Sequence, residues 1–418
     1  MRIKDKQVIL ILGSQHDFEE LAKTCIENGY YTIVCDNYTN GPAKKIAHKS
    51  YNVDVFDIKQ MEKICIENEV SGIVTGFSDV LMEAYVPLCE KMGLKCYLSD
   101  EQLKIIRNKQ IMHQILGEFG VKTMQRKVIY LQDIEQQLIG FKFPAVIKPI
   151  DGYGSRGVFK VNSIREIKEK YTEVENISKK RSVIIEKYNL GKEYNFFAWV
   201  KDGKGYLIYI CNREKFTFSP NDIGLVYKFI YPSSVYEKLF STVIEYMEKI
   251  IQAYKIQDGP LAVQMFYDGN EVVINEATLR LFGNGDHRIA FYLSGLKIEQ
   301  ILIEYSMGRG YSKSLISKLE NYNPRNTTII AQIQLYGKEG YIKEIDGVST
   351  IKEMPNVSNI ELYYQQGECI RNKGLKRETI GMVFFKVDRY DDIEKKLDEI
   401  YNVLHIIGDN GEELLYRI

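Results

Sequence analysis

The sequence predicts a mixed protein: an N-terminal α/β unit built on a doubly wound parallel sheet, followed by α+β units. Two observations support this fold class. Over residues 7–100, short apolar runs alternate with stretches of helical spacing, which is the rhythm of βαβ units. Farther along, Asp268-Gly269-Asn270 separates two runs rich in apolar and aromatic residues, and such a turn indicates an antiparallel hairpin.

The first hundred residues supply the elements of the N-terminal unit in turn. Apolar runs predict strands over 8–12, 31–35 and 72–76, and helical spacing predicts helices over 17–28, 58–68 and 80–92. The first turn reads Gly-Ser-Gln-His-Asp and lacks the GxGxxG glycines that a pyrophosphate needs, so we exclude a dinucleotide site there. Ser78 and Asp79 follow the third strand, at the edge where open sheets bind ligands. A helix N-cap is the simpler role for Ser78.

The rest of the chain has longer helices and a second set of strand signals. Residues 101–120 are expected to form one helix that ends at Gly120, and 164–175 a charged helix with a solvated face. Another helix, over 236–254, has an apolar stripe for the core. Residues 321–328, with Pro324, are typical of a linker. Beyond it, a small α+β unit is expected, with strands over 328–335, 360–365 and 381–387 and a helix over 390–403.

Composition limits the class of protein. A chain of 418 residues suggests two to four domains. Lys and Arg number 56, as do Asp and Glu, and this zero net charge argues against a nucleic-acid binder. The seven cysteines form no CxxC pair and the five histidines are dispersed, so no zinc site is expected. No apolar run approaches the roughly 18 residues of a membrane span. We therefore expect a soluble, cytoplasmic protein without a membrane partner.

A lysine and a glycine-rich loop stand out between 143 and 160, in the segment FPAVIKPIDGYGSRGVFK. Lys148, at a strand end, would place a positive charge on an anionic oxygen. The loop holds small and hydroxyl residues, namely Gly152, Gly154, Ser155 and Gly157. Glycines let backbone N–H groups close over a phosphate without a Cβ in the way. The spacing is not that of a Walker loop. Taken alone, the loop fits a plain hairpin turn equally well.

A second segment favours the phosphate interpretation. Gln264 lies on the first strand of the predicted 258–285 hairpin, and Glu276, Thr278 and Arg280 follow one another at period two just after the second. These side chains can share one face. An amide, a carboxylate, a hydroxyl and a guanidinium together make a hard-cation site with an anion clamp. Alone, the pattern could be a solvated edge strand. With the lysine–glycine loop, the site is the better interpretation.

In this order and spacing, the motifs resemble those of the ATP-grasp superfamily, and the resemblance covers nearly the whole chain. Within it, the chain resembles the carbamoyl-phosphate-synthetase-like and L-amino-acid-ligase-like members. The resemblance implies an ATP-grasp fold with a pre-ATP-grasp domain over 1–106, an ATP-grasp domain over 107–320 and a C-terminal α+β domain over 321–418. Within the ATP-grasp domain, it implies a lid at about 121–185 and a nucleotide and metal subdomain at 186–320.

The resemblance also implies a role for individual residues around ATP. Lys148 and Lys109 would contact phosphates, with Lys148 counted as catalytic. The loop from Asp151 to Gly157 would cover the triphosphate, and its implied ATP contacts are Tyr153, Gly154, Ser155 and Gly157. Glu186 and the backbone of Lys187 and Tyr188 would meet the adenine, and Glu193 the ribose.

Metal and substrate roles follow from the same resemblance. Glu276-x-Thr278-x-Arg280 resembles the Glu-x-Asn-x-Arg signature, so Glu276, Thr278 and Gln264 would bind Mg²⁺, or Mn²⁺ in its place. Thr278 stands where Asn is commoner, and Gln264 where many members have an acid. Arg280 would act on phosphate or substrate. Residues implied in acceptor binding are Arg280, Asn284, His287 and Arg288. An exposed histidine at a helix N-terminus is the simpler interpretation of His287.

The activity implied is that of an ATP-dependent carboxylate–amine (or thiol) ligase. It would work through an acyl phosphate on small-molecule substrates and release ADP and phosphate, and a homodimer is compatible with it. A carboxyphosphate-forming enzyme like carbamoyl-phosphate synthetase or biotin carboxylase is the first alternative. The former needs two ATP-grasp halves where this chain has one set of motifs, and no Met-Lys-Met biotin acceptor occurs here. A catalytically inactive ATP-binding regulatory protein is the second, because Thr278 and Gln264 are neutral ligands.

Overall fold

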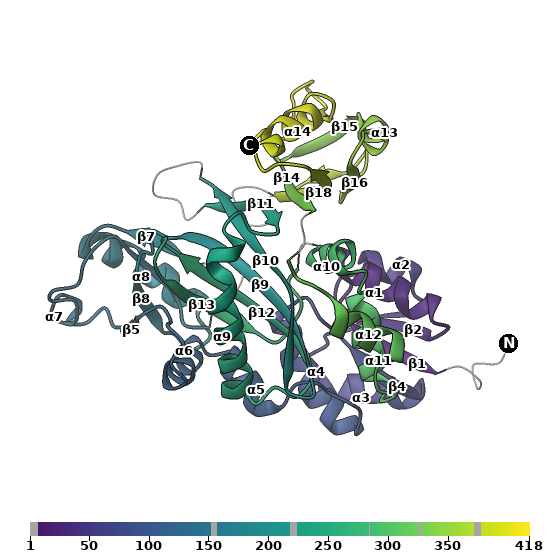
Figure 1. The fold of residues 1–418 in the computed structure, drawn as a ribbon, viewed down its shortest axis with the longest axis horizontal. Coiled ribbons are helices and arrows are strands. Elements are labelled where there is room, and N and C mark those ends of the chain that lie inside the picture. Colours follow the sequence, from purple (N-terminus) through teal and green to yellow (C-terminus); the bar gives the residue numbers. More distant parts are fainter. Residues whose placement is uncertain (1–6, 152–156, 218–223, 284, 326–327, 372–377) are drawn as a thin grey trace.

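The computed structural model describes residues 7–151, 157–217, 224–283, 285–325, 328–371 and 378–418. In this part of the chain the strands form a four-stranded N-terminal sheet, a four-stranded lid sheet, an eight-stranded central sheet and a small three-stranded sheet. Figure 1 shows the N-terminal unit and the lid on opposite sides of the central strands, with the C-terminal segment as a separate lobe above them.

The N-terminal unit is the predicted parallel sheet. Its strands β1 (Val8–Leu12), β2 (Tyr31–Asp36), β3 (Lys49–Asn52) and β4 (Val70–Val74) lie in the order β3-β2-β1-β4. Between and after them run α1 (His16–Glu27), α2 (Pro42–Ile46), α3 (Ile58–Glu67) and α4 (Asp79–Met92). Every residue of β1 is buried, as its apolar run predicts. β3 was not predicted, because this exposed edge strand has no apolar run. Ser78 is the N-cap of α4 but makes no side-chain cap hydrogen bond.

The prediction of a single helix over 101–120 is wrong. Two helices occur instead, α5 (Asp100–Ile106) and α6 (Lys109–Glu118). The reason is Asn108, whose side chain accepts hydrogen bonds from the backbone N–H groups of Gln110 and Ile111. An asparagine in this conformation caps a new helix rather than continuing the old one. Lys109 therefore occupies the first position of α6.

The lid is a small sheet with its own core. Its antiparallel strands β5 (Arg126–Ile129), β6 (Ala145–Pro149), β7 (Phe159–Val161) and β8 (Val183–Lys187) lie in the order β5-β8-β6-β7. The helices α7 (Ile134–Gln137) and α8 (Ile164–Ile177) accompany them. β6 and β7 are the hairpin predicted around the glycine-rich loop. At its end Gly157 has φ +68°, and a Cβ there would lie 2.8 Å from Ile177 Cδ1. Only glycine fits this position without strain.

The central sheet runs through the molecule. Its strands are β9 (Lys192–Lys201), β10 (Lys204–Phe216), β11 (Leu225–Tyr231), β12 (Gly259–Tyr267), β13 (Val272–Thr278), β14 (Ile329–Gly337), β16 (Val357–Leu362) and β18 (Glu378–Val387). They lie in the order β13-β12-β9-β10-β11-β14-β18-β16. The predicted hairpin at Asp268 is present between β12 and β13. Helix α9 (Tyr236–Tyr254) packs on β9, β10 and β13 with the apolar stripe that its sequence predicts.

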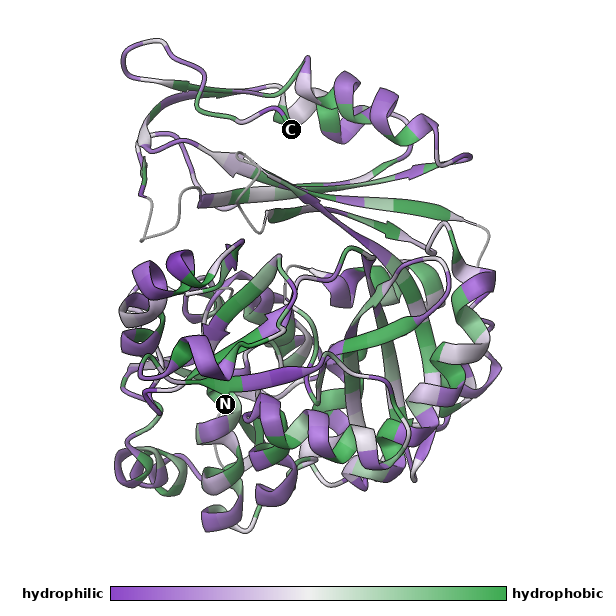
Figure 2. Cartoon of the chain, turned by 90° about the vertical axis from the view of Figure 1, so that its left-hand side faces the viewer, coloured by the Kyte–Doolittle hydropathy of each residue, from purple (hydrophilic) through white to green (hydrophobic). Residues whose placement is uncertain are grey.

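The C-terminal strands continue this sheet, because β14 pairs with β11. The remaining elements of this lobe are β15 (Gly340–Asp346), β17 (Cys369–Ile370), β19 (His405–Gly408), α13 (Val348–Glu353) and α14 (Asp392–Tyr401). They enclose a second apolar cluster that also includes Ile230 of β11. Figure 2 shows the hydrophobic colouring concentrated on the strands, with the C-terminal lobe across one end.

Three helices lead from the central sheet back to the N-terminal unit: α10 (Asp286–Ser294), α11 (Ile298–Ser306) and α12 (Lys313–Asn321). Helix α11 packs against α1 and β4. The seven cysteines are all free; Cys369 is exposed, Cys96 is half-buried and the others are buried. Among the described helices, none has the length and apolar character to cross a bilayer.

Candidate nucleotide and metal site

A buried ion cluster occupies the lid sheet. Lys148, near the end of β6, donates a 2.6 Å hydrogen bond to Oε1 of Glu186 on β8. Arg126 on β5 donates to Oε2 of the same carboxylate. Burial alone would raise the pKa of Glu186, but Lys148 and Arg126 outweigh it and lower this pKa to about 2. Burial, with Arg126 and Lys109 nearby, lowers the pKa of Lys148 to about 8, although Glu186 opposes the shift.

Arg126 also ties the lid to the central sheet. Its Nη2 donates to the backbone oxygen and to Oδ1 of Asn275, each at 3.0 Å, and Nη1 contacts His113. Burial and Arg126 lower the pKa of His113 to about 3, so this imidazole is neutral at pH 7. The backbone N–H of Met124 donates to Ile274 of β13 at 3.2 Å. The lid and β13 thus meet next to Glu276. Sequence reasoning missed Arg126, since it stands in the polar run Gln125–Lys127.

The predicted metal face is formed by β12 and β13. Gln264 lies opposite Glu276 in the strand register, and both are half-buried. Glu276 and Thr278 lie inside β13 rather than just after it. Nζ of Lys109, at the start of α6, is 3.7 Å from Oε1 of Glu276. One carboxylate with neutral oxygen donors beside it fits Mg²⁺, which commonly takes one or two carboxylates and keeps its waters.

Thr278 and Arg280 share a partner that was singled out only for its place at a strand end. Oγ1 of Thr278 donates to Oδ1 of Asp79, and Nη2 of Arg280 donates to Oδ2, both at 2.7 Å. Burial would raise the pKa of Asp79, but Arg280 and Thr278 lower it to about 2. Nη1 of Arg280 donates to the Leu281 carbonyl oxygen at 2.8 Å. Its Nε is buried and lacks a hydrogen-bond partner among the described residues.

The residues expected around adenine and ribose lie at the junction of β8 and β9. Lys187 is exposed, and the Tyr188 backbone N–H donates to the Pro144 oxygen at 3.0 Å. Glu193 on β9 forms ion pairs with Arg213 and Lys215 of β10. Burial raises the pKa of Glu193, but these two cations dominate and lower it. The predicted loop residues Tyr153, Gly154 and Ser155 lie outside the described residues, as does Asn284.

The expectation of an exposed His287 is wrong. Its side chain is buried in α10, with the ring centroid 5.1 Å from that of Phe77 and Nε2 3.5 Å from Oε1 of Glu299. Burial lowers the pKa of His287 to about 3 and raises that of Glu299 to about 7. The sequence pattern hid this, because an Asp-His-Arg run at a helix start is typical of a solvated turn. Arg288, next along the helix, forms an ion pair with Glu361 of β16.

The loop after Arg280 lies between the N-terminal unit and the C-terminal lobe. Its Gly285 N–H donates to Oδ1 of Asp17 in α1 at 3.0 Å. His16 stacks on Tyr363 beyond β16, with ring centroids 4.1 Å apart. Potential ligand atoms of His16, Glu19 and Glu361 lie within 4.8 Å of one another. This junction is where the predicted acceptor residue Arg288 lies.

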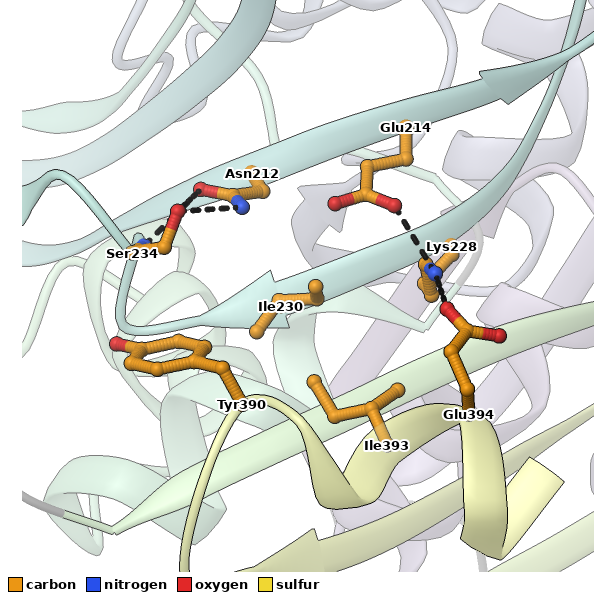
Figure 3. Close-up of a pocket in the computed structure, with 8 residues that line it drawn as sticks. All are labelled: Asn212, Glu214, Lys228, Ile230, Ser234, Tyr390, Ile393 and Glu394. Atoms are coloured by element: carbon orange, nitrogen blue, oxygen red, sulfur yellow. Dashed lines mark hydrogen bonds and ion pairs between the residues drawn. The ribbon is translucent and has the colours of Figure 1, made fainter.

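A separate cavity of about 190 Å³ lies between the central sheet and α14. Figure 3 shows its lining side chains, which are Asn212, Glu214, Lys228, Ile230, Ser234, Tyr390, Ile393 and Glu394. Lys228 bonds to Glu214 at 3.0 Å and also to Glu394. None of the predicted site residues that the structure describes lines it. Because its charged groups already pair with one another, we regard this cavity as part of the packing of α14.

The chain is similar in sequence to several known proteins. The ATP-grasp domain family matches residues 141–286. A formate-dependent phosphoribosylglycinamide formyltransferase of Vibrio vulnificus is 22% identical over 355 residues, which is 83% of this chain and 85% of the relative. The enzyme of the same name from Methanocaldococcus jannaschii is 28% identical over 169 residues, 40% of this chain and 43% of the relative.

Solved structures show the same fold over almost the full length. An L-amino acid ligase from Bacillus licheniformis has a TM-score of 0.79 at 17% identity, covering 97% of this chain and 99% of the other. A phosphoribosylglycinamide synthetase from Anaerococcus prevotii has a TM-score of 0.76 at 19% identity, covering 97% of this chain and 100% of the other.

Proposed function

We propose that the chain is an ATP-grasp enzyme, an ATP-dependent ligase that joins a small-molecule carboxylate to an amine and releases ADP and phosphate. One observation carries the proposal. Lys148 of the lid and Lys109 of α6 come from distant segments, yet they lie near enough for one charge to lower the pKa of the other. Lys109 also lies beside Glu276. Cations gathered in this way next to a carboxylate suit a metal-bound triphosphate.

The proposed reaction has two steps. A carboxylate oxygen of the first substrate attacks the γ-phosphorus of ATP, and ADP leaves. The amine nitrogen then attacks the acyl carbon and loses a proton, and phosphate leaves. Neither step needs a nucleophilic side chain, so the protein contributes position and charge.

We assign the roles as follows. Lys148 and Lys109 bind phosphate oxygens, and Arg280 steadies the carboxylate or the transferred phosphoryl group. Glu276 would hold Mg²⁺, with Gln264 and Thr278 as neutral donors, and the ion when bound would offset phosphate charge. Mn²⁺ suits the same oxygen donors. In this assignment, Arg126 keeps Glu186 ionised and so holds the lid lysine in place.

The products and the metal carboxylate test this function. With a panel of carboxylates and amines, the products should be ADP and phosphate rather than AMP and pyrophosphate. Glu276→Gln should abolish turnover but only weaken ATP binding, since Lys148 and Lys109 remain. Glu271→Gln is the matched control: Glu271 lies in the turn before β13, is paired with Lys122 on the surface, and should leave turnover unchanged.

Three outcomes would contradict the proposal. AMP as product, or full activity in Glu276→Gln, would rule out the mechanism. Tight ATP binding with no turnover on any carboxylate and amine pair would favour the regulatory alternative, which the neutral residues Gln264 and Thr278 keep open.

A further inference from the structure

We propose that Asp79 is a positioning residue for this reaction: it fixes the Thr278 hydroxyl and the Arg280 guanidinium in the orientations that a metal-bound nucleotide requires. The proposal rests on the function proposed above. It adds a residue of the N-terminal unit to a site otherwise built from the central sheet, the lid and α6.

The geometry gives each oxygen of Asp79 a different task. Oδ1 accepts from Thr278 at 2.7 Å, while Oδ2 accepts from Arg280 at 2.7 Å. Asp79 is the first residue of α4, where the helix dipole favours a negative charge. The side chains of Asp79 and Arg280 are each only 15% exposed, so this contact is shielded from solvent. A carboxylate placed in this way keeps both partners in one orientation.

The contact with Asp79 decides what Thr278 can offer to a ligand. Asp79 forms an ion pair with Arg280, and a carboxylate can only accept hydrogen bonds. The Thr278 hydroxyl must therefore donate its one proton to Asp79, which leaves only lone pairs on Oγ1. In that state threonine presents the same kind of group as the amide oxygen of the asparagine that is commoner at this position. Threonine in place of the commoner asparagine is therefore not a sign of lost catalysis, because Asp79 orients the hydroxyl so that its oxygen faces a ligand as an acceptor.

A guanidinium has five N–H groups, and two of those of Arg280 donate to protein acceptors here. Its Nη1 and Nη2 are held by the Leu281 carbonyl and by Asp79. Nε is buried and has no hydrogen-bond partner in the described part of the chain. A buried cationic donor without a partner is costly, so an anion is expected to complete this site. Asp79 fixes the plane of the guanidinium and therefore the direction in which this N–H points.

The test measures metal binding as well as turnover. Mn²⁺ binding in the presence of ATP, followed by electron paramagnetic resonance, should weaken at least tenfold in Asp79→Asn. The Mg²⁺ concentration for half-maximal turnover should rise by a similar factor, and kcat should fall more than KM for ATP rises. ATP binding without metal should change less than twofold. Glu83→Gln is the matched control, because it removes another ion pair of α4, with Arg107 at 2.6 Å, and should leave all these quantities unchanged.

Variants of Thr278 separate positioning from folding. Thr278→Ser keeps the hydroxyl and should keep wild-type Mn²⁺ binding, whereas Thr278→Val should lose it as Asp79→Asn does. The double variant should be no worse than the poorer single one, because both remove the same contact. This comparison decides the question even if Asp79→Asn does not fold.

The outcomes also separate this proposal from the proposed function. Wild-type Mn²⁺ binding in a folded Asp79→Asn, or in Thr278→Val, would overturn the role of Asp79 while leaving the ligase proposal intact. If the wild-type protein ligates no substrate, the function fails, and Mn²⁺ binding by the variants still tests Asp79.

Discussion

Glu186 is a counter-ion shared by two cations of the candidate site. One of its oxygens holds Lys148 and the other holds Arg126, so the carboxylate that the resemblance assigned to adenine is engaged with two cations here. Its role at adenine stays a prediction. What the contacts support is that the Lys148 ammonium is kept buried next to a counter-ion, and that an arriving phosphate would compete with Glu186 for it.

At the residue scale, ATP affinity should depend on the charge of Lys148. Its pKa is lowered from 10.5 to about 8, chiefly by burial. The ammonium is therefore present below pH 8 and is lost as pH rises above it. We expect the ATP dissociation constant to increase above pH 8, by up to tenfold per pH unit, in calorimetric titrations. Lys148→Ala should weaken ATP binding at least tenfold at pH 7, because hydrogen bonds to charged groups contribute about 1.5–3 kcal/mol.

The variant also serves as the reference for the pH profile. In Lys148→Ala the increase of the ATP dissociation constant above pH 8 should disappear. Lys168→Ala removes an exposed lysine of α8 that pairs with Glu135, and it should behave as wild type. Unchanged ATP binding in Lys148→Ala would remove this residue from the site.

At the element scale, the start of α6 presents Lys109 to the site. A lysine at a helix N-terminus opposes the helix dipole, and the first turn of α6 contains no acidic residue. The Asn108 cap holds this turn together. Asn108→Ala should lower the free energy of unfolding by about 1 kcal/mol and weaken ATP binding, because the turn bearing Lys109 would fray. Urea denaturation and calorimetry measure the two effects.

Asn108→Asp is the matched variant, since aspartate caps a helix as well as asparagine does. It should keep the stability and the ATP affinity of the wild type. Equal values for the alanine and aspartate variants would show that the cap does not position Lys109.

The elements also show what a sequence can predict. β1, α9 and the β12–β13 hairpin were predicted because their apolar periodicity and turn residues are local signals. β3 was missed because an exposed edge strand lacks such a signal. The break between α5 and α6 was missed because it depends on the hydrogen bonds of one side chain, that of Asn108. For the site, Lys148 and Glu276 belong to recognisable motifs. Arg126 was not found at all, and Asp79 only as a strand-end residue, because each acts through partners on other strands.

At the scale of the whole molecule, the C-terminal lobe completes the central sheet. β14 covers the edge of β11, and Ile230 of β11 packs in the C-terminal cluster. A chain ending at residue 325 would expose this edge and that isoleucine. We expect it to aggregate, and size-exclusion chromatography would show the loss of monomer.

Supplying residues 328–418 as a second chain should restore a soluble complex, because it returns the missing strand. A soluble, monomeric, ATP-binding chain ending at 325 would mean that the lobe contributes little to the sheet.

The cysteines differ in exposure, and their rates of chemical labelling can therefore report on local opening of the fold. Cys369 is exposed, whereas burial raises the pKa of Cys35 and Cys65 to about 12 and leaves little reactive thiolate. A thiol-specific dye should therefore label Cys369, in the C-terminal lobe, before it labels Cys35 or Cys65. Slower labelling at Cys35 of β2 or Cys65 of α3 would record how often the N-terminal unit opens, and mass spectrometry of dye uptake could time that opening.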